Sequence, residues 1–126
     1  MLKRIFVVDD EKCIADTLAA ILRKAGYESS AFYDAQSALQ EVYSCTPELV
    51  ISDVDMPGMN GVEMAICIRK NCQSCKVLLF SGRATTAEIL KTAGEHGYHF
   101  ELLSKPIHPT DLLAHIVSAE SETESG

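Results

Sequence analysis

The chain has 126 residues, of which 47% are hydrophobic and 23% are charged, a balance typical of one folded domain and not of a disordered chain. Its net charge of −7 disfavours a nucleic-acid-binding surface, because neutralising phosphates requires a basic face. The longest apolar runs are only as long as a strand, and no secretory leader is recognisable. We therefore expect a cytoplasmic protein without membrane contact.

The first half of the chain alternates between strand-like and helix-like patterns. Residues 4–8 form an apolar, β-branched run that predicts a buried strand. The apolar residues that follow repeat with the period of a helix, which we expect to end at Gly26. A weaker strand is predicted at 27–33, then a short helix capped by Asp34, and a third strand at 48–52.

The second half repeats this alternation. Strands are expected at residues 76–80 and 100–103, and helices are expected to begin at Asn60, Thr85 and Pro109. The first of these helix starts is the most specific, because an Asn followed by a Glu three residues later is the pattern of a capping box. The whole chain is thus predicted to contain five strand-then-helix units.

This order of elements predicts an α/β fold. We expect a doubly wound, five-stranded parallel sheet in the order 2-1-3-4-5, with helices on both faces and the flavodoxin-like topology. Residues 1–118 are assigned to this one domain, and 119–126 to a polar tail or linker stub. In such a sheet, ligands bind beyond the carboxyl ends of the strands, where the order reverses between the first and third strands.

Polar residues follow four of the predicted strands at that edge. Asp9 and Asp10 end the first strand, Asp53 ends the third, Ser81 ends the fourth and Lys105 follows the fifth. Three converging carboxylates would repel one another, and a hard divalent cation such as Mg²⁺ relieves that repulsion. A carboxylate in this setting can attack phosphorus, with Ser81 and Lys105 binding the phosphoryl oxygens.

The motifs at these positions resemble those of bacterial response-regulator receiver domains, chemotaxis regulators among them. The resemblance covers residues 3–118 and rests on VVDD at Val7–Asp10, ISDVDMPGMNGVE at Ile51–Glu63, FSG at Phe80–Gly82 and SKP at Ser104–Pro106. It implies that Asp53 accepts a phosphoryl group from a sensor histidine kinase or a histidine phosphotransfer protein. It also implies that the Mg²⁺ ligands are Asp9, Asp10, Asp53 and the carbonyl oxygen of Asp55.

The resemblance further implies which reactions the domain catalyses and how it passes on the signal. Such a domain catalyses only its own phosphorylation and dephosphorylation, and it turns over no separate substrate. Its output is a contact with a downstream protein, which we expect on the face formed by residues 85–115. Asp55 and Arg83 occupy positions at which the family tunes the lifetime of the acyl phosphate.

One position departs from the family pattern. The family places a Tyr or Phe three residues before the lysine, where this chain has Leu102. Phe100 lies two residues earlier and therefore on the same face of the predicted strand. Either Phe100 or Tyr98 takes over the role of the ring, or the switch is weaker here.

Two other functions fit part of the pattern. Asp53-Val-Asp55 after an apolar strand is similar to the first motif of haloacid-dehalogenase-type phosphatases, and Ser81 and Lys105 suit the next two roles. The acidic pair then lies at the N-terminus rather than after the lysine, and there is no room for a substrate-selecting cap. An interaction module that is not phosphorylated is the other alternative, but it has little reason to keep a costly carboxylate cluster.

The five cysteines predict no disulfide framework, because their number is odd and no secretory leader precedes them. Cys72 and Cys75 have the spacing of a redox or half-zinc motif, but no second pair at matching spacing exists. His96 and His99 could complete a site only if the fold brought them there. Free thiols in a reducing compartment are therefore expected.

Overall fold

A single parallel sheet organises the molecule, described here by a computed structural model that covers residues 4–82, 86–105 and 108–125. The strands are β1 (Arg4–Val8), β2 (Glu28–Phe32), β3 (Leu49–Asp53), β4 (Lys76–Ser81) and β5 (Glu101–Ser104). The helices are α1 (Lys12–Lys24), α2 (Ala35–Ser44), α3 (Gly61–Asn71), α4 (Thr86–Glu95) and α5 (Pro109–Ser125). The strand order is β2-β1-β3-β4-β5, so the predicted fold class and topology are confirmed.

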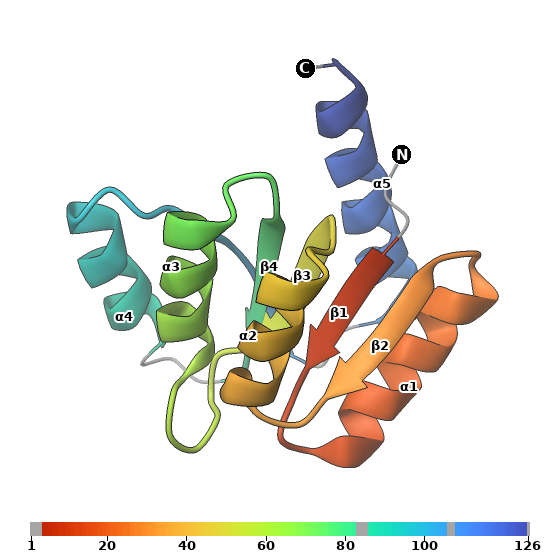
Figure 1. Ribbon diagram of the computed structural model, residues 1–126, viewed down its shortest axis with the longest axis horizontal. Coiled ribbons are helices and arrows are strands. Elements are labelled where there is room, and N and C mark those ends of the chain that lie inside the picture. Colours follow the sequence, from red (N-terminus) through yellow and green to blue (C-terminus); the bar gives the residue numbers. More distant parts are fainter. Residues whose placement is uncertain (1–3, 83–85, 106–107, 126) are drawn as a thin grey trace.

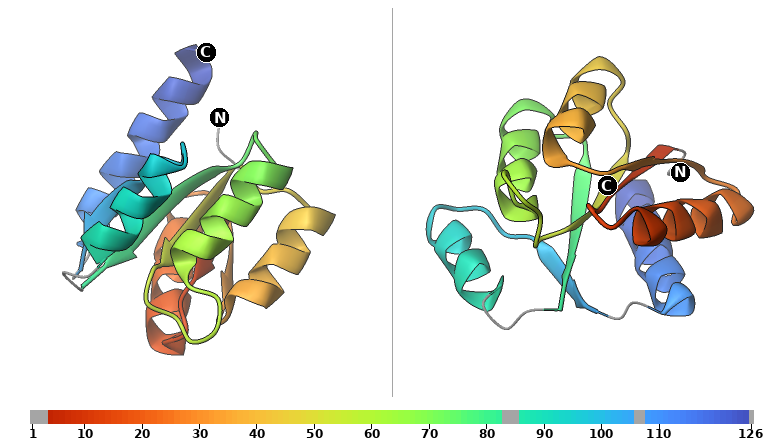
Figure 2. Two further views of the ribbon diagram at one scale, coloured as in Figure 1. Left: turned by 90° about the vertical axis from the view of Figure 1, so that its left-hand side faces the viewer. Right: turned by 90° about the horizontal axis from the view of Figure 1, so that it is seen from below.

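Helices cover both faces of the sheet, with α2, α3 and α4 on one side and α1 and α5 on the other (Figures 1 and 2). The interior strand β1, which lies between β2 and β3, shows how the sequence produces these layers. Phe6 and Val8 join the apolar cluster under α2 and α3, and Ile5 and Val7 join the cluster under α1 and α5. Because neighbouring residues of a strand face opposite sides, an uninterrupted apolar run fits a strand buried on both faces.

The predicted start and stop signals of the helices act as expected. Gly26 follows α1 and has a positive φ of 104°, a conformation that glycine adopts without steric cost. Asp34 caps α2 by accepting a hydrogen bond from the backbone N–H of Ser37 at 2.7 Å. Asn60 and Glu63 form a complete capping box at the start of α3, which fixes where this helix begins beside the end of β3.

The structure differs from the sequence prediction at several element ends. β3 and β5 lie one residue further along the chain than predicted, and β2 is shorter by one residue at each end. The helix α5 continues to Ser125, through residues that the sequence analysis assigned to a polar tail or linker stub. No Gly or Pro interrupts residues 110–125, and Ala and Glu favour helix. Thr85, the predicted start of the fourth helix, lies outside the described residues. No helix in the described parts is long and apolar enough to cross a membrane.

Candidate functional site

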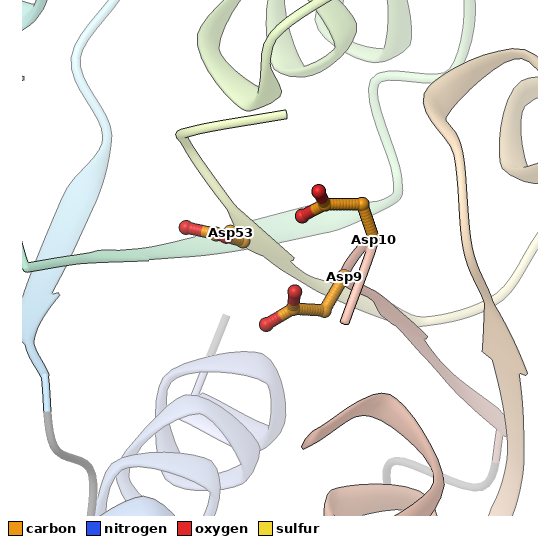
Figure 3. A group of neighbouring side chains, drawn as sticks. All are labelled: Asp9, Asp10 and Asp53. Atoms are coloured by element: carbon orange, nitrogen blue, oxygen red, sulfur yellow. The ribbon is translucent and has the colours of Figure 1, made fainter. Parts of the chain in front are cut away.

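Three carboxylates meet beyond the carboxyl ends of β1 and β3 (Figure 3). Asp53 is the last residue of β3, Asp9 directly follows β1, and the pairing of Val8 with Ser52 sets the two strand ends side by side. One oxygen atom from each of Asp9, Asp10 and Asp53 lies within 4.8 Å of the others. Asp9 and Asp53 are buried and Asp10 is exposed, so the cluster is open to solvent on one side.

Lys105 supplies the opposing charge. Its Nζ lies 3.1 Å from Asp53 Oδ2 and 3.6 Å from Asp9 Oδ2. The lysine is positioned by its backbone N–H, which donates to the carbonyl oxygen of Ser81 at 3.0 Å across the ends of β4 and β5. Burial acts to lower the pKa of Lys105, but its contacts with Asp53 and Asp9 raise that pKa above its ordinary value. The side chain therefore stays cationic between the two buried carboxylates.

The two buried carboxylates are held in an environment that disfavours their charge. Burial raises the pKa of Asp9 to about 6, the charge of Asp53 adds to this rise, and a hydrogen bond from the Glu11 N–H opposes it. Burial also raises the pKa of Asp53, even though Lys105 donates to its carboxylate. Asp9 Oδ2 is buried and accepts no hydrogen bond from the residues that the structure describes. A further cation at this cluster would stabilise the ionised form of both carboxylates.

Ser81 and Asp55 are joined by a hydrogen bond. Ser81, the last residue of β4, is buried, and its hydroxyl donates to Asp55 Oδ2 at 2.9 Å. The backbone N–H of Asp55 in turn donates to Asp53 Oδ1 at 3.2 Å. The sequence placed Ser81 and Asp55 at this edge of the sheet without indicating that they bind each other. Arg83, the second predicted tuning residue, lies outside the described residues.

The start of α3 lies against the end of β3, and the first residue of this helix, Gly61, has a role that the sequence analysis missed. A Cβ at Gly61 would clash with the carbonyl oxygen of Asp53, so α3 approaches this strand end as closely as it does only with glycine there. The Gly61 N–H also donates to the carbonyl oxygen of Val54 at 3.0 Å. The sequence contained a signal for this role. Glycine is a poor helix former, so a glycine directly after an Asn cap suggests that the helix start lies close to another segment of the chain.

The two aromatic rings considered for the switch, those of Phe100 and Tyr98, lie against the core beneath α3 and α4. Phe100 and Tyr98 are partly buried there, and the Arg69 guanidinium lies 5.0 Å from the centre of the Phe100 ring. Leu102, on β5, remains 36% exposed. Phe100 thus contacts α3 through Arg69, whereas Leu102 stands where the family resemblance implies an aromatic residue.

The Cys72–Cys75 pair does not form part of a metal cluster within the described residues. The one group of His, Cys, Asp or Glu side chains there that is close enough to share an ion is the aspartate cluster. Cys75 is buried in the turn after α3, and burial raises the pKa of its thiol to about 12. The thiolate form needed for metal binding or disulfide exchange is therefore disfavoured at this residue.

Comparison with known proteins places these features in one family. The response regulator receiver domain model matches residues 5–117. A CheY-like receiver domain protein from Methanospirillum hungatei has a TM-score of 0.88 and 28% identity, covering 99% of this chain and 98% of its own. Response regulator TrrA from Thermotoga maritima, solved in complex with Mg(2+)-BeF, has a TM-score of 0.80 and 31% identity over 93% of this chain and 98% of its own. Chemotaxis protein CheY4 from Vibrio cholerae has a TM-score of 0.81 and 27% identity over 94% and 98%.

Proposed function

The chain belongs to the response regulator receiver domain family, and we propose that it is a phosphoacceptor whose Asp53 takes up a phosphoryl group and thereby switches a partner-binding face. The observation that carries this proposal is the position of one carboxylate. Asp53 ends the central strand β3, is 3% exposed, and lies 3.1 Å from the Lys105 ammonium and beside the acidic pair. This position supports a role for Asp53 both as a metal ligand and as a nucleophile.

The acidic cluster has the chemistry of a Mg²⁺ site. Its donors are all carboxylate oxygens, which hard divalent cations prefer, and Asp9 Oδ2 is buried without a hydrogen bond from the described residues. Asp9, Asp10 and Asp53 would hold the ion together with the Asp55 carbonyl oxygen, the set that the family resemblance implies. When bound, the ion neutralises negative charge on the phosphoryl oxygens.

Phosphoryl transfer then follows from the placement of two side chains. A carboxylate oxygen of Asp53 forms a bond to phosphorus while the bond from phosphorus to the donor's imidazole nitrogen breaks, and that nitrogen keeps the electron pair. Lys105 stabilises the charge on the transferred group, since its ammonium already lies between Asp53 and Asp9. The donor is a phosphohistidine of a cytoplasmic sensor kinase or a histidine phosphotransfer protein.

Loss of the phosphoryl group is a second displacement at phosphorus, in which water is the nucleophile and the Asp53 carboxylate is the leaving group. Water attacks phosphorus, the bond to Asp53 breaks, and inorganic phosphate leaves. The side chains of Asp55 and Arg83, at the two positions where the family tunes the lifetime of the acyl phosphate, set the rate of this hydrolysis. The chemistry is therefore self-catalysed, and the output is a change in the face formed by residues 85–115, which a downstream protein reads.

Acetyl phosphate tests this proposal without a kinase. With Mg²⁺ present, we expect the intact protein to gain the mass of one phosphoryl group, and we expect chelation of the metal to prevent this. Asp53→Asn should abolish the mass gain because it removes the nucleophile and keeps the shape. Asp16→Asn is the matched control, since this aspartate lies on α1 and its carboxylate binds the Tyr33 hydroxyl. Equal labelling of the Asp53→Asn variant and the wild type would contradict the proposal.

A further inference from the structure

The hydrogen bond from Ser81 to Asp55 occupies the only proton that the serine side chain can donate. A hydroxyl carries one donor, and here it points to Asp55 Oδ2 at 2.9 Å. Ser81 is 6% exposed, so water has little access to compete for this proton. Any other acceptor that binds the Ser81 hydroxyl must therefore break its bond to Asp55.

Asp55 is also tied to the residue that accepts the phosphoryl group. Its backbone N–H donates to Asp53 Oδ1 at 3.2 Å, two residues away. The two carboxylates are close enough for the charge of Asp55 to contribute to the raised pKa of Asp53, after burial as the main cause. A phosphoryl group on Asp53 would thus add negative charge beside Asp55 and new acceptor oxygens at the edge where Ser81 lies.

We propose that the Asp55 carboxylate is a latch that holds the Ser81 hydroxyl away from the acceptor site until a phosphoryl group arrives on Asp53. The phosphoryl group opens the latch in two ways, because its oxygens compete for the Ser81 proton and its charge repels the Asp55 carboxylate. Asp55 is a positioning residue in this account, and it acts through Ser81. The inference rests on the proposed function, since it requires an anion bound at Asp53.

The latch has a measurable consequence for anions that mimic the phosphoryl group. If Ser81 is held by Asp55 in most molecules, the apparent affinity for the anion is reduced by the fraction in which the hydroxyl is released. Hydrogen bonds to charged acceptors are among the stronger ones in proteins, so we expect opening the latch by mutation to tighten anion binding about 10-fold.

Titration with beryllofluoride in the presence of Mg²⁺ measures this effect, with backbone amide signals as the readout. Asp55→Ala should bind beryllofluoride about 10-fold more tightly than the wild type. Before any beryllofluoride is added, the amide signals of Ser81 and Gly82 should already be displaced toward their bound positions. Asp55→Asn keeps an uncharged acceptor and should fall between the two. Glu11→Gln is the control for charge alone, because it removes an exposed carboxylate whose charge acts on Lys105. It should tighten beryllofluoride binding only slightly.

A double-mutant cycle shows whether Asp55 acts through the serine. In the Ser81→Ala background, Asp55→Ala should change the affinity no more than Glu11→Gln does. An equal tightening in both backgrounds, or none in the wild-type background, would overturn the latch while leaving phosphorylation of Asp53 intact. Failure of the wild type to bind beryllofluoride with Mg²⁺ would overturn the proposed function and the latch together.

Discussion

Replacing Asp9 by Asn is expected to stabilise the metal-free protein at neutral pH, although it removes part of the site. The Asp9 side chain is fully buried, and burial together with the charge of Asp53 raises its pKa to about 6. At pH 7 the group is still mostly ionised in the folded state, so folding forces a charge into an unfavourable environment. An Asn has nearly the same shape, carries no charge, and can still accept the hydrogen bond from the Glu11 N–H.

The size and the pH dependence of the effect follow from linkage. The folded pKa, about 6, is higher than the ordinary value of 3.8, so the folded state binds more protons between these two values. Stability therefore falls as the pH rises from about 4 to about 6, and the loss of about 3 kcal/mol is complete at pH 7. We expect Asp9→Asn to recover only part of this loss, because the neutral amide no longer attracts the Lys105 ammonium.

Urea unfolding of the wild type and Asp9→Asn in a chelator, at several pH values, measures the difference directly. The variant should be more stable at pH 7, and the difference in stability should shrink toward about pH 4 as Asp9 becomes protonated in the folded state. Asp10→Asn is the matched control. Because Asp10 is exposed, this substitution should raise the stability much less. Mg²⁺ should stabilise the wild type more than Asp9→Asn. A variant that is no more stable at pH 7, or a difference independent of pH, would refute the reasoning.

Four further outcomes are expected. Gly61→Ala should cost about 2–4 kcal/mol in urea unfolding and slow labelling by acetyl phosphate, because the new methyl group meets the Asp53 carbonyl oxygen. Lys105→Ala should cost about 2 kcal/mol, less than for a fully buried pair because the side chain is 24% exposed, and stability unchanged in thermal unfolding would contradict this. Beryllofluoride should shift amide signals within residues 85–115, and signals that stay in place there would exclude this output face. Arg83→Ala should change the lifetime of the acyl phosphate in a decay assay and leave Mg²⁺ affinity nearly unchanged.

The layers of the fold could be predicted because the apolar pattern carries the needed information. The run Ile5–Val8 has no polar side for solvent, so it requires cover on both faces, and both apolar clusters use it. The ends of the strands were less predictable, since they depend on pairing with a neighbour. Ser104 belongs to β5 because it pairs with Ser81, and periodicity within either segment does not contain that information.

The convergence of the acidic residues at one edge could also be predicted. Parallel strands end at the same edge, so Asp9 and Asp53 had to meet once the strand order was known. Two other features could not be predicted: the hydrogen bond between Ser81 and Asp55, and the close approach of Gly61 to the Asp53 carbonyl oxygen. Both depend on the path of the loop between β3 and α3. That path is set by the side-chain cap at Asn60 together with tertiary packing, and only the cap was visible in the sequence.

The central claim, that Asp53 is the residue that carries the phosphoryl group, is tested most directly by locating that group on the chain. Hydroxylamine attacks an acyl phosphate and leaves a hydroxamate on the carboxylate that held it, whereas a phosphoserine ester does not react. After labelling with acetyl phosphate and Mg²⁺, treatment with hydroxylamine and peptide mapping by mass spectrometry should find the hydroxamate at Asp53. A hydroxamate at Asp55, or a hydroxylamine-resistant phosphate at Ser81, would contradict the account.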